Sequence, residues 1–368
     1  MIVNSCPQKD GFRSCGEFEK HWGTIIIFPE RSDIWRNNAF DAQNLIIKLA
    51  NIIINFENVL FCIKPHLVNM VSDRLDTRIK VVELDYDDIW ARDISPNFVV
   101  KDNHISCVCW GFNSWGGIDE GAYFPWDKDA SFAKNLSDYM QIPKYIVNEI
   151  ILEGGAIITD GCGTAITTKS VLLNKNRNPH KSINEIEEYI KNHFCVNKVV
   201  WLDGGLAFDE TNGHIDNICN FVAPGEICLA WTDDIKNPHY DIVRNAYNIL
   251  KNSVDANGNP FVIHKIPIPS LQFVTKEEEK QLTHSKSSTE RVAGFPLVPS
   301  YINYYLINSA LILPSFSCEW DTIVYQQMQR IFPTREIIQI DSREFLIGGG
   351  GFHCILHEIP FFNKGEKI

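Results

Sequence analysis

The sequence predicts an α/β fold. Short segments rich in β-branched or aromatic residues are typical of strands, and amphipathic segments between some of them are typical of helices. The order strand, strand, helix, strand recurs several times along the chain. Segments that carry reactive side chains come at the ends of strands or in the loops that follow. We therefore expect residues from separate units to converge on one centre.

The expected strands are short and distributed over the whole chain. They are Thr24–Phe28, Val59–Ile63, Lys80–Leu84, Phe98–Val100, Ile105–Trp110, Ala156–Thr159, Val199–Leu202, Ile218–Phe221, Ile227–Trp231, Phe261–Ile266, Leu311–Leu313, Ile337–Ile340 and Phe352–Leu356.

The expected helices repeat apolar residues at helical spacing. One of them has a clear start, because Ser182 and Glu185 stand at the spacing of a capping box, which satisfies free N–H groups of the first turn. The helices are expected over Ala42–Phe56, from Ser182 through Tyr189 toward His193, over His239–Lys251 and over Thr322–Ile331.

The charge balance argues against nucleic acid as a partner. The 368 residues include 34 Lys and Arg against 46 Asp and Glu, a net charge of −12. Binding to a phosphate backbone depends on clustered basic residues, so an acidic chain better suits a small cationic ligand or simply solubility. Hydrophobic content of 45% and charged content of 22% are those of a soluble globular protein.

Cysteine usage and the N-terminal segment indicate the cytoplasm. Eleven cysteines, an odd number without clustered spacing, argue against a disulfide scaffold. Met1–Pro7 lacks the basic and apolar regions of a signal peptide. The most apolar stretch, Leu45–Phe56, is too short and too polar to span a membrane. Cys107 and Cys109 share one face of a strand but have no second pair at zinc-site spacing, so no metal site is expected.

Cys354 is the candidate nucleophile. It follows the run Gly348–Gly351, in which the absence of side chains lets the backbone come close to another group. A free thiol has a pKa near ~8.5, so nucleophilic use requires a nearby base or positive charge. The alternative for Cys354 is a small buried hydrophobe, which is our expectation for the other cysteines. Strand alternation over this segment would turn the adjacent His353 away from Cys354.

His214 is the candidate acid and base, in the segment Asp209–Asn217. If the segment is extended, His214 and Asp216 project on the same face. A histidine can give a proton to a leaving amine and take one from water near neutral pH. The alternative is a buried structural histidine that bonds a backbone carbonyl.

The acids Asp93, Glu153 and Asp216 are candidates for binding a cation. Carboxylates bind a planar guanidinium through paired N–H donors, so Asp93 and Asp216 together could hold its carbon in front of a thiolate. Glu153 could stabilise a protonated His214 or accept from the guanidinium. The alternatives are an ion pair of Asp93 with its neighbour Arg92 and a solvated loop position for Glu153.

Tryptophans near these acids could form the walls of a pocket. Trp90, Trp115 and Trp231 offer faces that pack against an alkyl chain or a cation, although such residues are as often part of the core.

With these residues in view, the sequence resembles the agmatine deiminases of the guanidino-group-modifying (pentein) superfamily over nearly its whole length. Many ordered blocks carry the resemblance, and together they are specific where any one alone would not be. The blocks are Glu17–Glu19, Phe28–Arg31, Trp90–Asp93, Phe112–Gly117, Tyr123–Asp129, Leu152–Gly155, Leu173–His180, Glu210–Asn217 and Gly348–Cys354.

The resemblance implies a fold and an activity. The fold would be a single domain, residues 1–368, of five ββαβ units around a pseudo-fivefold axis: a five-bladed α/β propeller with a central active site. The activity would be hydrolysis of agmatine to N-carbamoylputrescine and ammonia, a step toward the polyamine putrescine, without a cofactor. A homo-oligomer is also implied.

The family's roles transfer to matching positions of this chain. Cys354 would be the nucleophile, His214 the acid and base, and Glu153 its partner. Asp93 and Asp216 would bind the guanidinium. Trp90, Trp115 and Gly351 would complete the substrate site.

This chain departs from the family pattern in a few places. Gly351 and Phe352 stand where an Asn and an Ile are usual, His357 and Glu358 where two Gln are usual, and Ser95 where a Gly is usual. Every position with a catalytic role is intact, so these departures bear on rate or substrate detail more than on the chemistry.

Three alternatives remain open. Free or peptidyl arginine could be the substrate, with Arg92, Arg177 or Arg291 as a partner for its carboxylate. A non-catalytic binding protein of this fold would be expected to lack the nucleophile or the acids, and none is missing. A papain-like protease predicts an early cysteine and a later histidine, the reverse of the order here.

Overall fold

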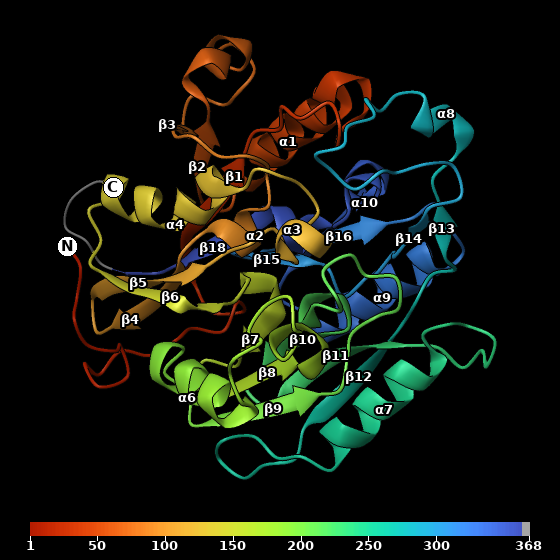
Figure 1. The fold of residues 1–368 in the computed structure, drawn as a ribbon. Coiled ribbons are helices and arrows are strands. Elements are labelled where there is room, and N and C mark those ends of the chain that lie inside the picture. Colours follow the sequence, from red (N-terminus) through yellow and green to blue (C-terminus); the bar gives the residue numbers. More distant parts are fainter. Residues whose placement is uncertain (363–368) are drawn as a thin grey trace.

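The computed structural model describes residues 1–362. Its strands form several separate sheets, shown in Figure 1. The strands are β1 (His21–Ile27), β2 (Asn58–Ile63), β3 (Lys80–Glu83), β4 (Asn97–Lys101), β5 (His104–Gly111), β6 (Lys144–Ile151), β7 (Ile157–Thr159), β8 (Thr164–Thr168), β9 (Lys198–Leu202), β10 (Cys219–Ala223), β11 (Glu226–Trp231), β12 (Val262–Pro267), β13 (Gln272–Phe273), β14 (Pro296–Leu297), β15 (Tyr305–Ile307), β16 (Ala310–Ser315), β17 (Glu336–Asp341) and β18 (Leu356–Pro360).

Five of these sheets follow the same plan. In the sheet β4-β5-β6, the first two strands are antiparallel and the third is parallel to the second. The sheets β7-β8-β9, β10-β11-β12 and β15-β16-β17 repeat this arrangement. The remaining sheet joins the two ends of the chain: β18 pairs antiparallel with β1, and β1 pairs parallel with β2, to which β3 is added. The predicted α/β class and its recurring order are confirmed.

A helix connects the second and third strand of each of these sheets, as a parallel crossover requires. The connecting helices lie toward the outside in Figure 1. They are α1 (Phe40–Ile53), α4 (Asp127–Tyr139), α6 (Ile183–His193), α7 (Tyr240–Lys251) and α9 (Trp320–Ile331). The shorter helices are α2 (Ala91–Ile94), α3 (Gly117–Glu120), α5 (Lys169–Leu172), α8 (Lys276–Glu279), α10 (Arg343–Gly348) and α11 (Phe352–Ile355), with 3-10 turns at η1 (Arg36–Ala39), η2 (Pro65–Met70), η3 (Gly154–Ala156) and η4 (Ile215–Asn217).

The predicted helix starting at Ser182 is confirmed with its capping box. The Ser182 side chain accepts from the Glu185 N–H, and the Glu185 carboxylate accepts from the Ser182 N–H. The helix α4 and the strands β6, β8 and β15 were not predicted. β8 shows why: its sequence, Thr-Ala-Ile-Thr-Thr, is polar, yet every residue in it is buried.

The prediction of a strand over Phe352–Leu356 was wrong. Residues Phe352–Ile355 form the helical turn α11, and β18 begins only at Leu356. The alternation of Phe352, Cys354 and Leu356 imitates a strand. The His353 N–H, however, donates to Asn303 rather than to a neighbouring strand. His353 is therefore not turned away from the cysteine's surroundings, as described below.

Apolar residues surround a set of charged side chains that are themselves buried. The apolar core includes members of all the sheets, such as Phe61, Val108 and Leu313. Within residues 1–362, no helix has both the length and the apolar character needed to cross a membrane.

Candidate active site

Cys354 lies buried at the centre of a polar cluster. Its Sγ is 3.8 Å from Oδ2 of Asp216 and 3.3 Å from Nδ2 of Asn303. Burial raises the pKa of the Cys354 thiol well above its usual value, and the carboxylates of Asp216 and Asp93 raise it further. In the free protein the thiol is therefore held protonated, and a cation placed beside it would favour its ionisation.

The glycine run brings the backbone close to other groups, as predicted. A Cβ at Gly348 would lie 2.2 Å from the Trp35 ring, and one at Gly350 would lie 2.5 Å from the Trp90 ring. Gly349 has a φ of +110°, which favours glycine, and it ends α10. The run therefore turns the chain from α10 into the turn that carries Cys354.

His214 is buried and poised between carboxylates. Its Nδ1 is 3.9 Å from Oδ1 of Asp93, and its Nε2 is 3.8 Å from Oε2 of Glu153. Within residues 1–362, neither ring nitrogen has a hydrogen-bond partner. Burial opposes the charge on the ring, but the nearby carboxylates, Asp93 foremost, raise the pKa of His214 to about 9. The ring is therefore protonated at neutral pH, and both of its N–H groups can donate to a ligand.

Glu153 is held in place by Arg177. The Arg177 Nε donates to Oε1 of Glu153 at 2.5 Å, and both side chains are completely buried. Burial alone would raise the pKa of Glu153, but Arg177 and His214 hold it at about 2. The second oxygen, Oε2, faces His214 and lacks a hydrogen-bond partner among the described residues.

Asp93 is oriented by two donors. Its Oδ1 accepts from the Gly155 N–H at 2.8 Å, and its Oδ2 accepts from Nε1 of Trp115 at 3.0 Å. Burial raises the pKa of Asp93 to about 6, with His214 opposing the rise. The alternative considered for Asp93, an ion pair with Arg92, is absent from the contacts of the described residues, because Arg92 instead bonds Glu358 at 2.7 Å.

Gly155 shows how closely the three groups converge. A Cβ at this position would lie 2.6 Å from Nδ1 of His214 and 2.9 Å from both Oδ2 of Asp216 and Oδ1 of Asp93. The glycine belongs to the turn η3, directly after Glu153 and Gly154. Only a residue without a side chain leaves these groups in place.

Asp216 forms a chain with His353 and Glu17. Nδ1 of His353 is 2.8 Å from Oδ2 of Asp216, and Nε2 of His353 is 2.7 Å from Oε2 of Glu17. Burial would raise the pKa of Asp216, but its hydrogen bond with His353 and the positive charges of His353, His214 and Arg92 together lower it. The other oxygen, Oδ1, has no hydrogen-bond partner in residues 1–362.

His214 and Asp216 reach the same centre by a different backbone than predicted. The segment is not extended: Ile215–Asn217 form the 3-10 turn η4. The turn still places both side chains against Gly155.

A pocket beside Cys354 has aromatic walls. Trp90 and Trp115 line it together with Tyr123, and Asp93 and Cys354 lie in the same pocket. The two indole rings meet edge to face, 5.9 Å apart. Trp90 and Trp115 therefore both lie in the pocket that contains Cys354.

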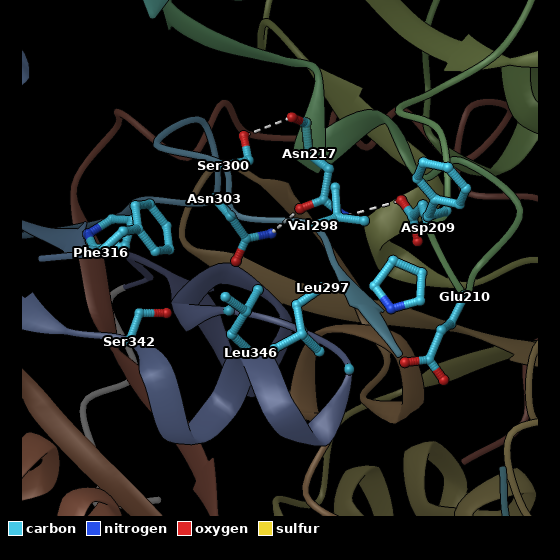
Figure 2. Close-up of a pocket in the computed structure, with 16 residues that line it drawn as sticks. Asp209, Glu210, Asn217, Leu297, Val298, Ser300, Asn303, Phe316, Ser342 and Leu346 are labelled. Carbon is cyan, nitrogen blue, oxygen red and sulfur yellow. Dashed lines mark hydrogen bonds between the residues drawn. The ribbon is translucent and has the colours of Figure 1, made fainter. Parts of the chain in front are cut away.

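Trp231 does not belong to this pocket. It packs between Arg244 and Lys265, whose charged groups lie 4.1 and 3.7 Å from its ring. Gly351 lines a neighbouring pocket, shown in Figure 2, rather than the pocket with the tryptophans.

Glu210 and Arg291 also line the tryptophan pocket. Nη2 of Arg291 donates to Oε2 of Glu210 at 2.8 Å and to the Gly348 carbonyl at 3.0 Å. In the sequence, Glu210 and Glu17 stand only within longer blocks, without a predicted role, and Arg177 is proposed only as a partner for a substrate carboxylate, not for Glu153. Asn303 was missed altogether, because an uncharged residue in an apolar segment gives no signal.

Comparison with known proteins gives a consistent result. Residues 13–360 match the family described as Porphyromonas-type peptidyl-arginine deiminase. The agmatine deiminase of Pseudomonas aeruginosa strain LESB58 is 41% identical over 358 residues, covering 97% of this chain and 97% of that protein. The agmatine deiminase of Pseudomonas putida strain KT2440 is 41% identical over 360 residues, covering 97% and 98%.

The solved structure of the agmatine deiminase of Enterococcus faecalis superposes with a TM-score of 0.94 at 34% identity, covering 98% of both chains. Sequence and fold agree along nearly the whole length. This chain therefore belongs to the Porphyromonas-type peptidyl-arginine deiminase family, together with the agmatine deiminases to which it is similar.

Proposed function

We propose that the protein is an agmatine deiminase, a hydrolase that converts agmatine and water into N-carbamoylputrescine and ammonia. One observation carries the proposal: unpartnered polar atoms of His214, Glu153 and Asp216 converge beside a buried cysteine. Buried polar atoms without partners are rare, so these atoms are placed to bind a ligand. The acids and the thiol fit a guanidinium, a planar cation with several N–H donors.

In the first half of the proposed reaction, Asp93 and Asp216 bind the guanidinium N–H groups. The cation between them favours ionisation of Cys354, which releases its proton to solvent, and the thiolate sulfur attacks the central carbon. As the C–N bond breaks, His214 gives its proton to the leaving nitrogen, and ammonia departs. The product is an S-alkylthiouronium on Cys354. Glu153 stabilises the charged form of His214 before the transfer.

In the second half, His214 takes a proton from a water molecule. The resulting hydroxide attacks the thiouronium carbon. As the C–S bond breaks, the added hydroxyl gives its proton to the departing sulfur, which re-forms the thiol and leaves the carbonyl of the ureido product. The water supplies the carbonyl oxygen, so atoms balance without a metal or cofactor in the proposed steps.

Agmatine fits the pocket better than arginine does. The indole rings of Trp90 and Trp115 offer an apolar wall for a butyl chain. An α-carboxylate would require a free cation in the pocket. Arg291 is the arginine that lines it, and its guanidinium is already engaged by Glu210 and the Gly348 carbonyl.

The wider expectations belong to the same proposal. We infer that the five sheets of common plan are the five ββαβ units of a propeller-like single domain over residues 1–368. The proposed partner is a small cation, and neither nucleic acid nor a membrane is part of the proposal. We further propose that the protein is a homo-oligomer, lies in the cytoplasm and contributes to putrescine formation. In support of a reducing compartment, the cysteines of the described residues are all free.

Ammonia release from agmatine, with arginine measured in parallel, tests the proposal. We expect turnover of agmatine, detection of N-carbamoylputrescine by mass spectrometry, and little release from arginine. Release from arginine alone would keep the mechanism and replace the substrate. No release from either compound by the folded protein would reject the proposal.

A further inference from the structure

Asn303 contacts the sulfur of Cys354. Its Nδ2 lies 3.3 Å from Sγ, on the loop that precedes β15. Figure 2 shows Asn303 in a pocket next to Asn217. The mechanism described above does not use this amide.

The surrounding hydrogen bonds fix which end of the amide faces the sulfur. Asp209 Oδ2 accepts from Nδ2 of Asn217 at 3.0 Å, so Oδ1 of Asn217 must face Asn303. That oxygen accepts from Nδ2 of Asn303 at 3.0 Å. On the other side, the His353 N–H donates to Oδ1 of Asn303 at 3.0 Å. A flipped Asn303 would set donor against donor at His353 and acceptor against acceptor at Asn217. One N–H of Nδ2 is therefore left for Cys354.

The same chain of hydrogen bonds reaches the histidine of the site. Oγ1 of Thr211 donates to Oδ1 of Asp209 at 2.6 Å and accepts from the His214 N–H at 3.2 Å. The loop with the acid and base and the turn with the nucleophile are thus joined through Asp209, Asn217 and Asn303. This connection sets the direction of the Asn303 amide relative to both His214 and Cys354.

The sulfur has few donors to stabilise a negative charge. Burial, Asp216 and Asp93 all raise the pKa of Cys354, whereas the Gly351 N–H and the Asn303 amide lower it. A hydrogen bond to a charged group is stronger than one between neutral groups, so a donor placed here gains strength when the thiolate forms.

We propose that Asn303 stabilises and orients the thiolate of Cys354, with Asn217 and Asp209 fixing its amide so that an N–H faces the sulfur. This inference rests on the proposed function in one respect: the thiolate is the nucleophile of deimination. It also predicts the reactivity of Cys354 toward reagents other than the substrate.

The test compares Asn303→Leu, Asn303→Asp and wild type. Iodoacetamide alkylation of Cys354 is measured between pH 6 and 10, with the Cys354 peptide quantified by mass spectrometry because ten other cysteines are present. Without the Asn303 donor, the alkylation rate of Cys354 should begin to rise at a pH about one unit higher than in wild type. For agmatine, kcat should fall about 10- to 100-fold with KM little changed.

The Asp variant separates electrostatics from packing. Asn303→Asp keeps the shape and the acceptor for the His353 N–H, but it sets a carboxylate oxygen against the sulfur. We expect it to be slower than Asn303→Leu in both assays, whereas a packing role predicts the reverse order. Ser300→Ala, in the same pocket but bonded to the Asn217 carbonyl instead, serves as the control and should stay within about threefold of wild type.

The outcomes are separable. The role of Asn303 would be overturned if the variants and wild type had the same pH profile of Cys354 alkylation. It would also be overturned if Asn303→Asp were more active than Asn303→Leu. A displaced limb in a protein that does not turn over agmatine would support Asn303 and reject the proposed substrate. Circular dichroism confirms that each variant is folded, and Asn303→Ala replaces Asn303→Leu if the latter is not.

Discussion

Replacing Gly155 by alanine should disable the site while leaving the fold intact. The backbone at Gly155 is outside the left-handed region, so alanine fits its conformation. The added methyl group, however, would lie 2.6 Å from Nδ1 of His214 and 2.9 Å from Oδ2 of Asp216 and Oδ1 of Asp93. Ordinary contacts are about 3.5–4.0 Å, so these groups must move by roughly 1 Å.

The effect of such a displacement on the reaction rate can be estimated. Misplacing reacting groups by about 1 Å costs about 100-fold in rate, which corresponds to about 2.7 kcal/mol of activation free energy. Overpacking of the interior should lower the free energy of unfolding by about 1–3 kcal/mol. We therefore expect kcat/KM for agmatine to fall at least about 100-fold in Gly155→Ala, with a cooperative unfolding transition still present.

Gly204→Ala is the matched control for this experiment. A Cβ at Gly204 would meet only Ser170 atoms, at 3.5 and 3.7 Å, which are ordinary contacts. The assay is steady-state ammonia release together with thermal unfolding followed by circular dichroism. If Gly155→Ala kept a third or more of the wild-type kcat/KM, the crowding argument would be refuted.

Three further predictions concern charge and the nucleophile. Cys354→Ala should fold normally and show no turnover, and measurable ammonia release from it would exclude the thiol as nucleophile. The pH profile of kcat/KM should be bell-shaped: activity rises as Asp93 loses its proton near pH 6 and falls as His214 loses its proton near pH 9, because binding needs the carboxylate and the leaving nitrogen needs the imidazolium. A flat profile from pH 5 to 10 would contradict those assignments. Arg177→Met should cost about 3–5 kcal/mol of stability in denaturant titration, since it leaves Glu153 buried without its cation. Arg177→Lys, which keeps the charge, should cost clearly less.

The sequence predicted the structure best where a pattern is compatible with only one local conformation. The capping box at Ser182 and Glu185 begins a helix as predicted, and the alternation of strands and helices yields the observed order of elements. The candidate residues Cys354, His214 and Asp216 also come together, although the backbone of each is a turn rather than a strand.

What the sequence could not provide depends on contacts between distant segments. The strand prediction over Phe352–Leu356 failed because Asn303, far away in the chain, binds the His353 N–H and stabilises a turn. The pairing of Arg177 with Glu153 is equally invisible, since each residue alone looks like a solvated loop charge. Threonine-rich β8 went unrecognised because burial, not composition, makes it a central strand.

The pairing of β18 with β1 has a consequence for how the protein matures. β18 follows directly on the turn that carries Cys354, and it pairs with β1, the first strand in chain order. During synthesis, the acids and the histidine are complete long before the thiol has a position among them. The reactive centre therefore depends on a pairing between strands far apart in the chain, and enzymatic activity reports on this long-range pairing rather than on any locally folded part.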